Sequence, residues 1–188
     1  VVVVVVGGGG WQWWLAVVVG SGGGVSHLEV VLDLARDAVH ADAGVFVDAL
    51  AANGLSLDLS EMAEAARFVT PVGPPRRFDT RFFVAAAPAD QIAKHDEEEV
   101  VQHVWIEPGE AIAQFRNDAF PMMSVTHRML ACLARYETVA ELMAVAHERK
   151  PIQRVRVNDP DGAYEVVLPG EPGYETADLE IEHGWIRI

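Results

Sequence analysis

The amino-acid sequence predicts an α/β fold in which a mixed sheet lies between helices, followed by C-terminal helices and a β extension. The first observation is the helical spacing of apolar residues, which begins at Leu28 and returns in the stretches that follow Pro108 and Pro121. The second is a set of shorter runs in which apolar and polar residues alternate, bounded by proline and glycine. Strand, helix, strands and helices in this order are typical of an α/β or α+β domain with a mixed sheet.

The composition indicates how the chain is divided. The chain has 188 residues, 51% of them hydrophobic, which is enough for one well-buried core. We expect residues 1–150 to form the main domain and residues 151–188 to form the β extension. Residues 1–24 are of low complexity, and their first fourteen include six valines, four glycines and three tryptophans. They are either a hairpin with strands at 1–6 and 11–19 or a segment that is not genuine sequence.

Two helices are expected in the amino-terminal half of the chain. The first follows the apolar positions from Leu28 and ends at Gly44, which has the residue type of a helix C-cap. The second begins at Asp58, because Asp58 and Glu61 have the spacing of a capping box, and it extends to about Arg67. Both helices would precede most strands of the sheet.

The remaining elements are predicted from alternation, prolines and capping residues. Strands are expected at 67–71, 77–87, 100–106, 154–157, 163–168 and 184–188. The fourth and fifth of these strands form a hairpin. One helix begins at Pro108, a second covers residues 122–136, and a third ends near Glu148. The third helix begins with a capping box made by Thr138 and Glu141.

The charge balance limits the kinds of partner. The chain carries 28 acidic residues against 14 lysines and arginines, a net charge of −14. Nucleic acids and anionic membranes bind clustered cations, so we expect neither as a partner. An acidic protein binds a polyanionic substrate when a divalent metal ion bridges the two sets of charges. A metal-dependent small-molecule site is therefore compatible with the composition.

Cysteine usage and hydropathy bear on the location of the protein. Cys132 is the only cysteine, which excludes an internal disulfide and fits a reducing compartment, so we expect a cytoplasmic protein. Cys132 lies in the amphipathic stretch "RMLACLARY", where a core position is expected. No apolar run reaches the roughly 20 residues that a membrane span requires.

Two stretches in the middle of the chain carry a pattern that is similar to a known family. Residues 66–91 contain a threonine-proline, a proline-rich turn and the run "RRFDTRFF" at 76–83. Residues 97–112 continue with Glu99, then Trp105 six residues later, then a proline-x-x-alanine. This pattern resembles the Nudix hydrolase family, and within it the branch of coenzyme A diphosphatases and their bacterial relatives.

The resemblance extends over about residues 20–175 and includes the stretch "VLPGEPGY" at 167–174. It implies a Nudix-like α/β/α sandwich. It implies a hydrolase that uses magnesium or manganese to cleave the diphosphate of a nucleotide-type small molecule, either coenzyme A-like or ADP-ribose-like. It also implies a homodimer.

The metal-binding box of that family aligns with residues 23–45 without a gap. Glu29 falls on the first glutamate of the box, and the closing glycine and aliphatic residue are also present. The arginine position and the three acid positions that follow it hold Asp37, Ala38, Ala41 and Asp42. Positions 38, 41 and 42 share one helix face, and alanine cannot ligate a cation. Two of the three expected carboxylates are therefore missing, which should cost most of the metal affinity.

The candidate site residues come from the box, from the acidic loop 95–99 and from the arginines of "RRFDTRFF". According to the resemblance, the catalytic residues are Glu29, Asp42 and Glu99. The metal ligands that it implies are Glu29, Asp37, Asp42, Glu98 and Glu99. Glycine amides and guanidinium groups both match phosphate oxygens. The candidate substrate-binding residues are therefore Gly22, Gly23, Arg76, Arg77 and Arg81.

Alternatives remain at each level. The loop 95–99 also has the composition of a solvated acidic loop, and the three arginines can instead pair with Asp79 and other acids of this acidic chain. For the whole protein, the loss of two box acids also fits a catalytically inactive Nudix-fold protein. Such a protein would bind a nucleotide or a protein partner without turnover.

Overall fold

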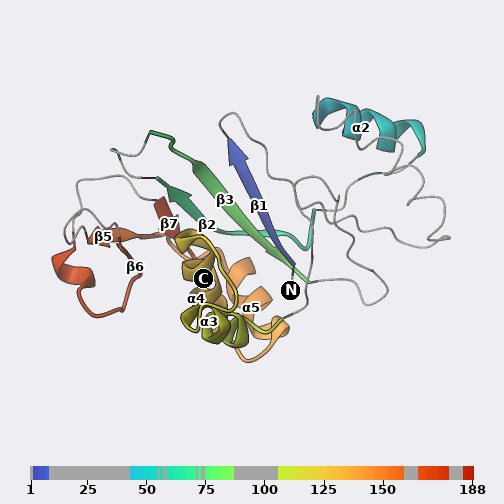
Figure 1. Ribbon diagram of the computed structural model, residues 1–188. Coiled ribbons are helices and arrows are strands. Elements are labelled where there is room, and N and C mark those ends of the chain that lie inside the picture. The colour runs from blue at the N-terminus through green and yellow to red at the C-terminus, as the bar shows by residue number, and fades with distance from the viewer. Residues whose placement is uncertain are drawn as a thin grey trace. The chain divides into compact units, whose positions relative to one another are not determined.

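The chain is divided into two compact units. The computed structural model describes residues 2–8, 43–54, 56, 59–70, 72, 75–86, 106–158, 165–177 and 184–188 (Figure 1). One unit comprises Val1–Leu15 together with Met62–Ile188, and the other comprises Ala16–Glu61. Across the described ranges, no helix is both long enough and apolar enough to span a membrane.

The larger unit contains a five-stranded sheet. In spatial order its strands are β1 (Val2–Gly8), β3 (Asp79–Ala85), β2 (Ala63–Val69), β7 (Gly184–Ile186) and β4 (Gln153–Arg154). Every pairing among the described strands is antiparallel, whereas a mixed sheet was expected. The short connection between β2 and β3 requires this direction, because parallel neighbours need a long crossover. The described residues therefore combine helices with an antiparallel sheet.

Two short strands outside this sheet confirm the predicted hairpin near the C-terminal end. They are β5 (Arg156–Asn158) and β6 (Glu165–Val167), and they pair antiparallel with Val157 opposite Val166. The predicted strands at 77–87 and 184–188 are likewise confirmed, as β3 and β7. The last strand of the chain thus belongs to the main sheet.

Three helices of the larger unit match the sequence expectation. They are α3 (Pro108–Arg116), α4 (Ser124–Leu133) and α5 (Val139–His147). Pro108 occupies the first turn of α3, where its missing N–H costs nothing. The predicted capping box is present at α5. The Thr138 hydroxyl accepts from the Glu141 amide at 3.2 Å, and the Glu141 carboxylate accepts from the Thr138 amide at 3.2 Å.

The core forms between one face of the sheet and helices α4 and α5, which lie together beside the sheet in Figure 1. The sheet contributes the buried side chains of Phe68, Phe82, Val84, Ile186 and Ile188. The helices contribute Met129, Cys132, Leu133, Leu142, Met143 and Ala146. The rings of Phe68 and Phe82 meet edge to face with centroids 5.5 Å apart. Burial of each large apolar side chain contributes about 1.5–3 kcal/mol to folding.

A β-bulge in β2 decides which side chains face away from the core. The register against β3 places Glu64 opposite Phe83 and Ala66 opposite Phe82, so one residue of β2 is extra. Glu64 and Arg67 are three residues apart, yet the bulge places them on the same face of the sheet. This outer face is opposite to the one that packs against α4 and α5.

Helix α2 (Ala43–Ala52), in the smaller unit, corrects one predicted boundary. Gly44 was expected to end a helix, but it lies in the first turn of α2. The glycine that follows the helix is Gly54, which has a φ of 68° and an amide 3.0 Å from the Ala51 carbonyl. A left-handed residue of this kind is what a helix C-terminus requires. Residues 28–42 lie outside the described part of the chain.

The helix predicted from Asp58 to Arg67 is wrong, because residues 63–67 belong to β2. The capping signal at Asp58 and Glu61 is a local feature. Strands β3 and β7 pair with the two edges of β2, and this tertiary pairing outweighs the local signal. The expected strands at 11–19 and 100–105 lie outside the described residues.

Gly184 allows β7 to approach β2 closely. It is buried, and its φ is 103°, a conformation that residues with a side chain rarely adopt. A Cβ at this position would lie 1.8 Å from the Arg67 carbonyl oxygen. Only glycine therefore fits this contact between the two strands.

Replacement of Gly184 by alanine is expected to lower the free energy of unfolding by at least about 3 kcal/mol, because the new Cβ meets backbone that cannot move. The matched control is Gly109→Ala in α3, where an added Cβ meets nothing within 4 Å. The control should be unchanged or more stable by up to about 1 kcal/mol. Urea unfolding measures both variants, and equal midpoints would contradict the close contact of β7 with β2.

Candidate functional site

Most of the predicted site residues lie outside the described part of the chain. This holds for Gly22, Gly23, Glu29, Asp37, Asp42, Glu98 and Glu99, whose roles stay predictions. The structure describes the other three, which are Arg76, Arg77 and Arg81. Within the described ranges, no group of three or more histidine, cysteine, aspartate or glutamate side chains is placed to hold a metal ion.

The connection between β2 and β3 is closed by Thr70, Phe78 and Arg77. The Thr70 amide donates to the Phe78 carbonyl at 2.8 Å, and the Phe78 amide donates to the Thr70 hydroxyl at 2.9 Å. The Nε of Arg77 donates to the Thr70 carbonyl at 2.9 Å. Arg77 therefore supports the turn. Arg76 is exposed and has no hydrogen-bond or ion-pair partner among the described residues.

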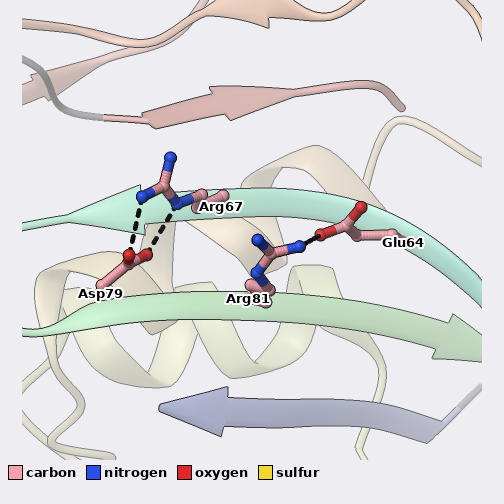
Figure 2. A network of polar contacts seen from close by, with 4 residues as sticks. All are labelled: Glu64, Arg67, Asp79 and Arg81. Carbon is pink, nitrogen blue, oxygen red and sulfur yellow. Dashed lines mark hydrogen bonds and ion pairs between the residues drawn. The ribbon is translucent and has the colours of Figure 1, made fainter. Parts of the chain in front are cut away.

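Arg67 and Arg81 each bind an acid on the outer face of β2 and β3 (Figure 2). Nε and Nη2 of Arg67 donate to the two carboxylate oxygens of Asp79, each at 2.7 Å. Nη1 of Arg81 donates to Oε1 of Glu64 at 2.8 Å. The alternative in which these arginines pair with acids is confirmed for Arg81, and its partner is Glu64. The bulge after Glu64 makes this pairing possible.

The two acids compensate a repulsion between like charges. Arg67 and Arg81 stand directly opposite each other on neighbouring strands, an arrangement that is unfavourable without counter-charges. Asp79 and Glu64 lie diagonally across the same strands and supply these counter-charges. The hydrogen bonds from Arg67 have the largest effect and lower the pKa of Asp79. Burial opposes them, and the charges of Arg67 and Arg81 lower the pKa further.

A row of arginines with one tryptophan crosses the outer face of the sheet. Arg81 of β3 lies opposite Arg67 of β2, and Arg67 lies opposite Trp185 of β7. Trp185 in turn lies opposite Arg154 of β4. The guanidinium carbon of Arg187 lies 5.1 Å from the centre of the Trp185 ring. We call these five residues the arginine row.

Of the arginine row, only Arg81 was predicted from the sequence as a site residue. The alternation in "GWIRI" carried a usable signal, because it separates Trp185 and Arg187 from the buried Ile186 and Ile188. Arg154 carried no such signal. It joins the row only because β4 pairs with the far edge of β7.

The stretch "VLPGEPGY" supports the end of this row. Glu171 forms an ion pair with Arg128 of α4. Three residues later, the Tyr174 hydroxyl donates to the Arg154 carbonyl at 2.6 Å. The Tyr174 ring also packs under the guanidinium of Arg156, at 4.1 Å. The stretch thus connects helix α4 to strand β4 and holds the backbone of Arg154 in place.

Helix α4 carries two further groups that could take part in chemistry. The His127 ring lies 4.7 Å from the Phe115 ring, and burial, followed by the charges of Arg128 and Arg116, lowers its pKa. Cys132 is buried in the core, as expected, and burial raises the pKa of its thiol to about 11. The thiol is therefore protonated at neutral pH and is not a nucleophile.

Comparisons with known proteins assign no family to the chain. No protein-family model matches it, and no curated protein or solved structure matches it either. A functional proposal for this chain therefore rests on its own residues and their arrangement.

The Asp79→Asn variant is expected to be less stable than the parent at pH 7 by up to about 1 kcal/mol, because the ion pair with Arg67 is partly exposed to solvent. The lowered pKa means that this contribution is present above about pH 4 and is lost as the pH falls through the pKa of the folded state. Urea unfolding at several pH values measures the difference. A difference that grows toward low pH would contradict the assignment of the pair.

The Cys132 thiol is expected to react with a thiol reagent such as DTNB at least about tenfold faster in denaturing urea than in the native protein, because it is buried and protonated when folded. Absorbance of the released chromophore gives both rates. Similar rates in the two states would show that Cys132 is accessible and would remove it from the core.

Proposed function

We propose that this protein is a Nudix-type hydrolase that uses a divalent metal ion to cleave a nucleoside diphosphate derivative, either coenzyme A-like or ADP-ribose-like. The observation that carries the proposal is the run "RRFDTRFF" at 76–83, which resembles the coenzyme A diphosphatase branch. The ion pairs of Arg81 and Asp79 support it, because they keep charged groups of this run on an open face of the sheet.

A Nudix-like α/β/α sandwich and a homodimeric assembly belong to the same proposal. The described sheet, with α4 and α5 packed on one face, supports this architecture at the level of a combined helix and sheet fold. The more specific assignment, a Nudix-like sandwich, rests on the resemblance of the sequence to that family.

The donor chemistry suits a hard divalent cation, because carboxylate oxygens are the ligands that magnesium and manganese prefer. Glu29, Asp42, Glu98 and Glu99 would hold the ion, with Asp37 as a further donor. When bound, the ion offsets the negative charge of the diphosphate and activates water.

The three predicted arginines differ in what they can offer a substrate. Arg76 is exposed and is the most available donor, whereas the Nε of Arg77 is already used by the Thr70 carbonyl. Arg81 is held by Glu64 through one guanidinium nitrogen and keeps its other donors. Guanidinium groups in these positions would orient phosphate oxygens, with the Gly22 and Gly23 amides as further donors.

A second candidate function is favoured by a specific observation. Ala38 and Ala41 stand at two acid positions of the aligned box, and alanine provides no ligand. A catalytically inactive Nudix-fold protein would keep the phosphate-binding groups and lose turnover. It would then act by binding a nucleotide or a protein partner.

The test is hydrolysis of coenzyme A, ADP-ribose and a dinucleotide by the purified protein with magnesium or manganese. Anion-exchange chromatography is expected to show phosphorylated fragments. The Asp42→Ala variant should lower the rate about 100-fold or more, because it removes a proposed ligand. The matched control is Asp48→Ala, which removes an exposed acid of α2 and should leave the rate unchanged.

Absence of fragments with both metals would overturn the hydrolase proposal. In that case, a rise in the melting temperature with ADP-ribose or coenzyme A would support the binding protein instead. Equal loss of activity in Asp42→Ala and Asp48→Ala would show that the aligned box is not the metal site.

A further inference from the structure

We propose that the arginine row binds the diphosphate group of an organic ligand, with Arg154 and Arg187 as ligand contacts in addition to Arg81. The class of ligand rests on the proposed function. The position of the binding surface rests on the geometry of the outer face of the sheet, which the sequence pattern did not assign.

The row has the length of an extended ligand. Neighbouring strands in a sheet lie about 4.8 Å apart, so the backbone positions of Arg81 and Arg154, three strands from each other, are separated by about 14 Å. Arg81, Arg67, Trp185 and Arg154 lie directly opposite one another on successive strands, so their side chains share one face of the sheet. This face therefore offers several guanidinium groups along one line.

Two of the four arginines of the row have an acidic partner within the protein, and two have none among the described residues. Asp79 and Glu64 are engaged with Arg67 and Arg81. Arg154 is exposed, and its side chain has no partner among the described residues. Arg187 has no acidic partner in the same ranges, and its buried Nε has no hydrogen-bond acceptor. Among the described residues, Arg154 and Arg187 therefore have no acid beside them on this face, and the proposal assigns an anionic ligand to them.

The guanidinium of Arg187 and the backbone of Arg154 are held before a ligand arrives. The Trp185 ring lies under the guanidinium of Arg187, a cation–π contact that restricts its side chain. The backbone of Arg154 is fixed by the Tyr174 hydroxyl. Groups that are already ordered lose less entropy when they bind, and a guanidinium group matches phosphate oxygens with two parallel hydrogen bonds.

The ligand is a small molecule and not a nucleic acid. A long polyanion would extend beyond the row onto a chain whose net charge is −14, and it would be repelled there. A short diphosphate contacts the row alone. The negative charge of the rest of the protein is weakened at this surface by screening over about 8–10 Å.

The experiment measures ADP-ribose binding by titration calorimetry in the presence of EDTA, so that neither metal nor turnover contributes. Arg154→Ala and Arg187→Ala are each expected to weaken binding about tenfold, the loss of one charge-assisted contact. The matched control is Arg116→Ala, which removes the same charge from an exposed position at the end of α3 and should change the dissociation constant less than about twofold. Inorganic pyrophosphate should give the same ranking of variants.

Arg187 packs on Trp185, so its replacement by alanine removes a packing contact as well as the proposed ligand contact. A second variant at this position separates loss of binding from loss of folding. Arg187→Lys retains the charge and loses the forked geometry, and it is expected to bind more weakly than the parent at an unchanged melting temperature. No binding by the parent protein, no effect of Arg154→Ala, or an equal effect of Arg116→Ala would each overturn the inference. A ranking seen with ADP-ribose and not with pyrophosphate would also overturn it.

Failure of this inference is distinguishable from failure of the proposed function. If the protein hydrolyses ADP-ribose and the Arg154 and Arg187 variants keep the parent's KM, the arginine row is not the binding surface and the hydrolase proposal stands. If binding depends on these arginines in a protein that releases no fragments, the row is confirmed and the hydrolase proposal fails.

Discussion

The pairing of β2 with β3, including the single bulge after Glu64, is the constraint on which the rest of the structure depends. It brings Phe68 and Phe82 together in the core and leaves the other edge of β2 for β7. A slip of one residue in this register would turn every side chain of a strand to the opposite face. The core and the charged outer face are therefore two consequences of one backbone arrangement.

The ion pairs on the outer face contribute more to orientation than to stability. The side chains of Arg81 and Asp79 are about half exposed, at 54% and 47%, and pairs in such positions contribute about 0–1 kcal/mol. The geometry of the Arg67–Asp79 pair is nevertheless well defined, because Arg67 donates hydrogen bonds to both carboxylate oxygens of Asp79. Such pairs fix the direction of the guanidinium groups on this face of the sheet.

Local sequence signals correctly predicted the helix starts that do not depend on contacts with distant parts of the chain. The capping box at Thr138 and the proline at position 108 mark helix starts because the missing backbone partners must be satisfied within the helix end. Most of β2 was predicted as helix because Asp58 and Glu61 have the spacing of a capping box, and only pairing with β3 and β7 decides in favour of a strand. The positions of Arg67, Trp185 and Arg154 in the arginine row were not predicted, for a related reason. These residues are far apart in sequence and meet only through strand register, which no local pattern encodes.

The place of β7 in the sheet has a consequence for biosynthesis. β7 lies between β2 and β4, so the sheet stays divided until residues 184–188 have been translated. Ile186 and Ile188, which are part of the core, arrive more than a hundred residues after the strand they pack beside. Contacts of such wide sequence separation form late and slow the search for the native state. Until then β2 presents an unpaired edge, and an unpaired strand edge favours aggregation of the incomplete chain.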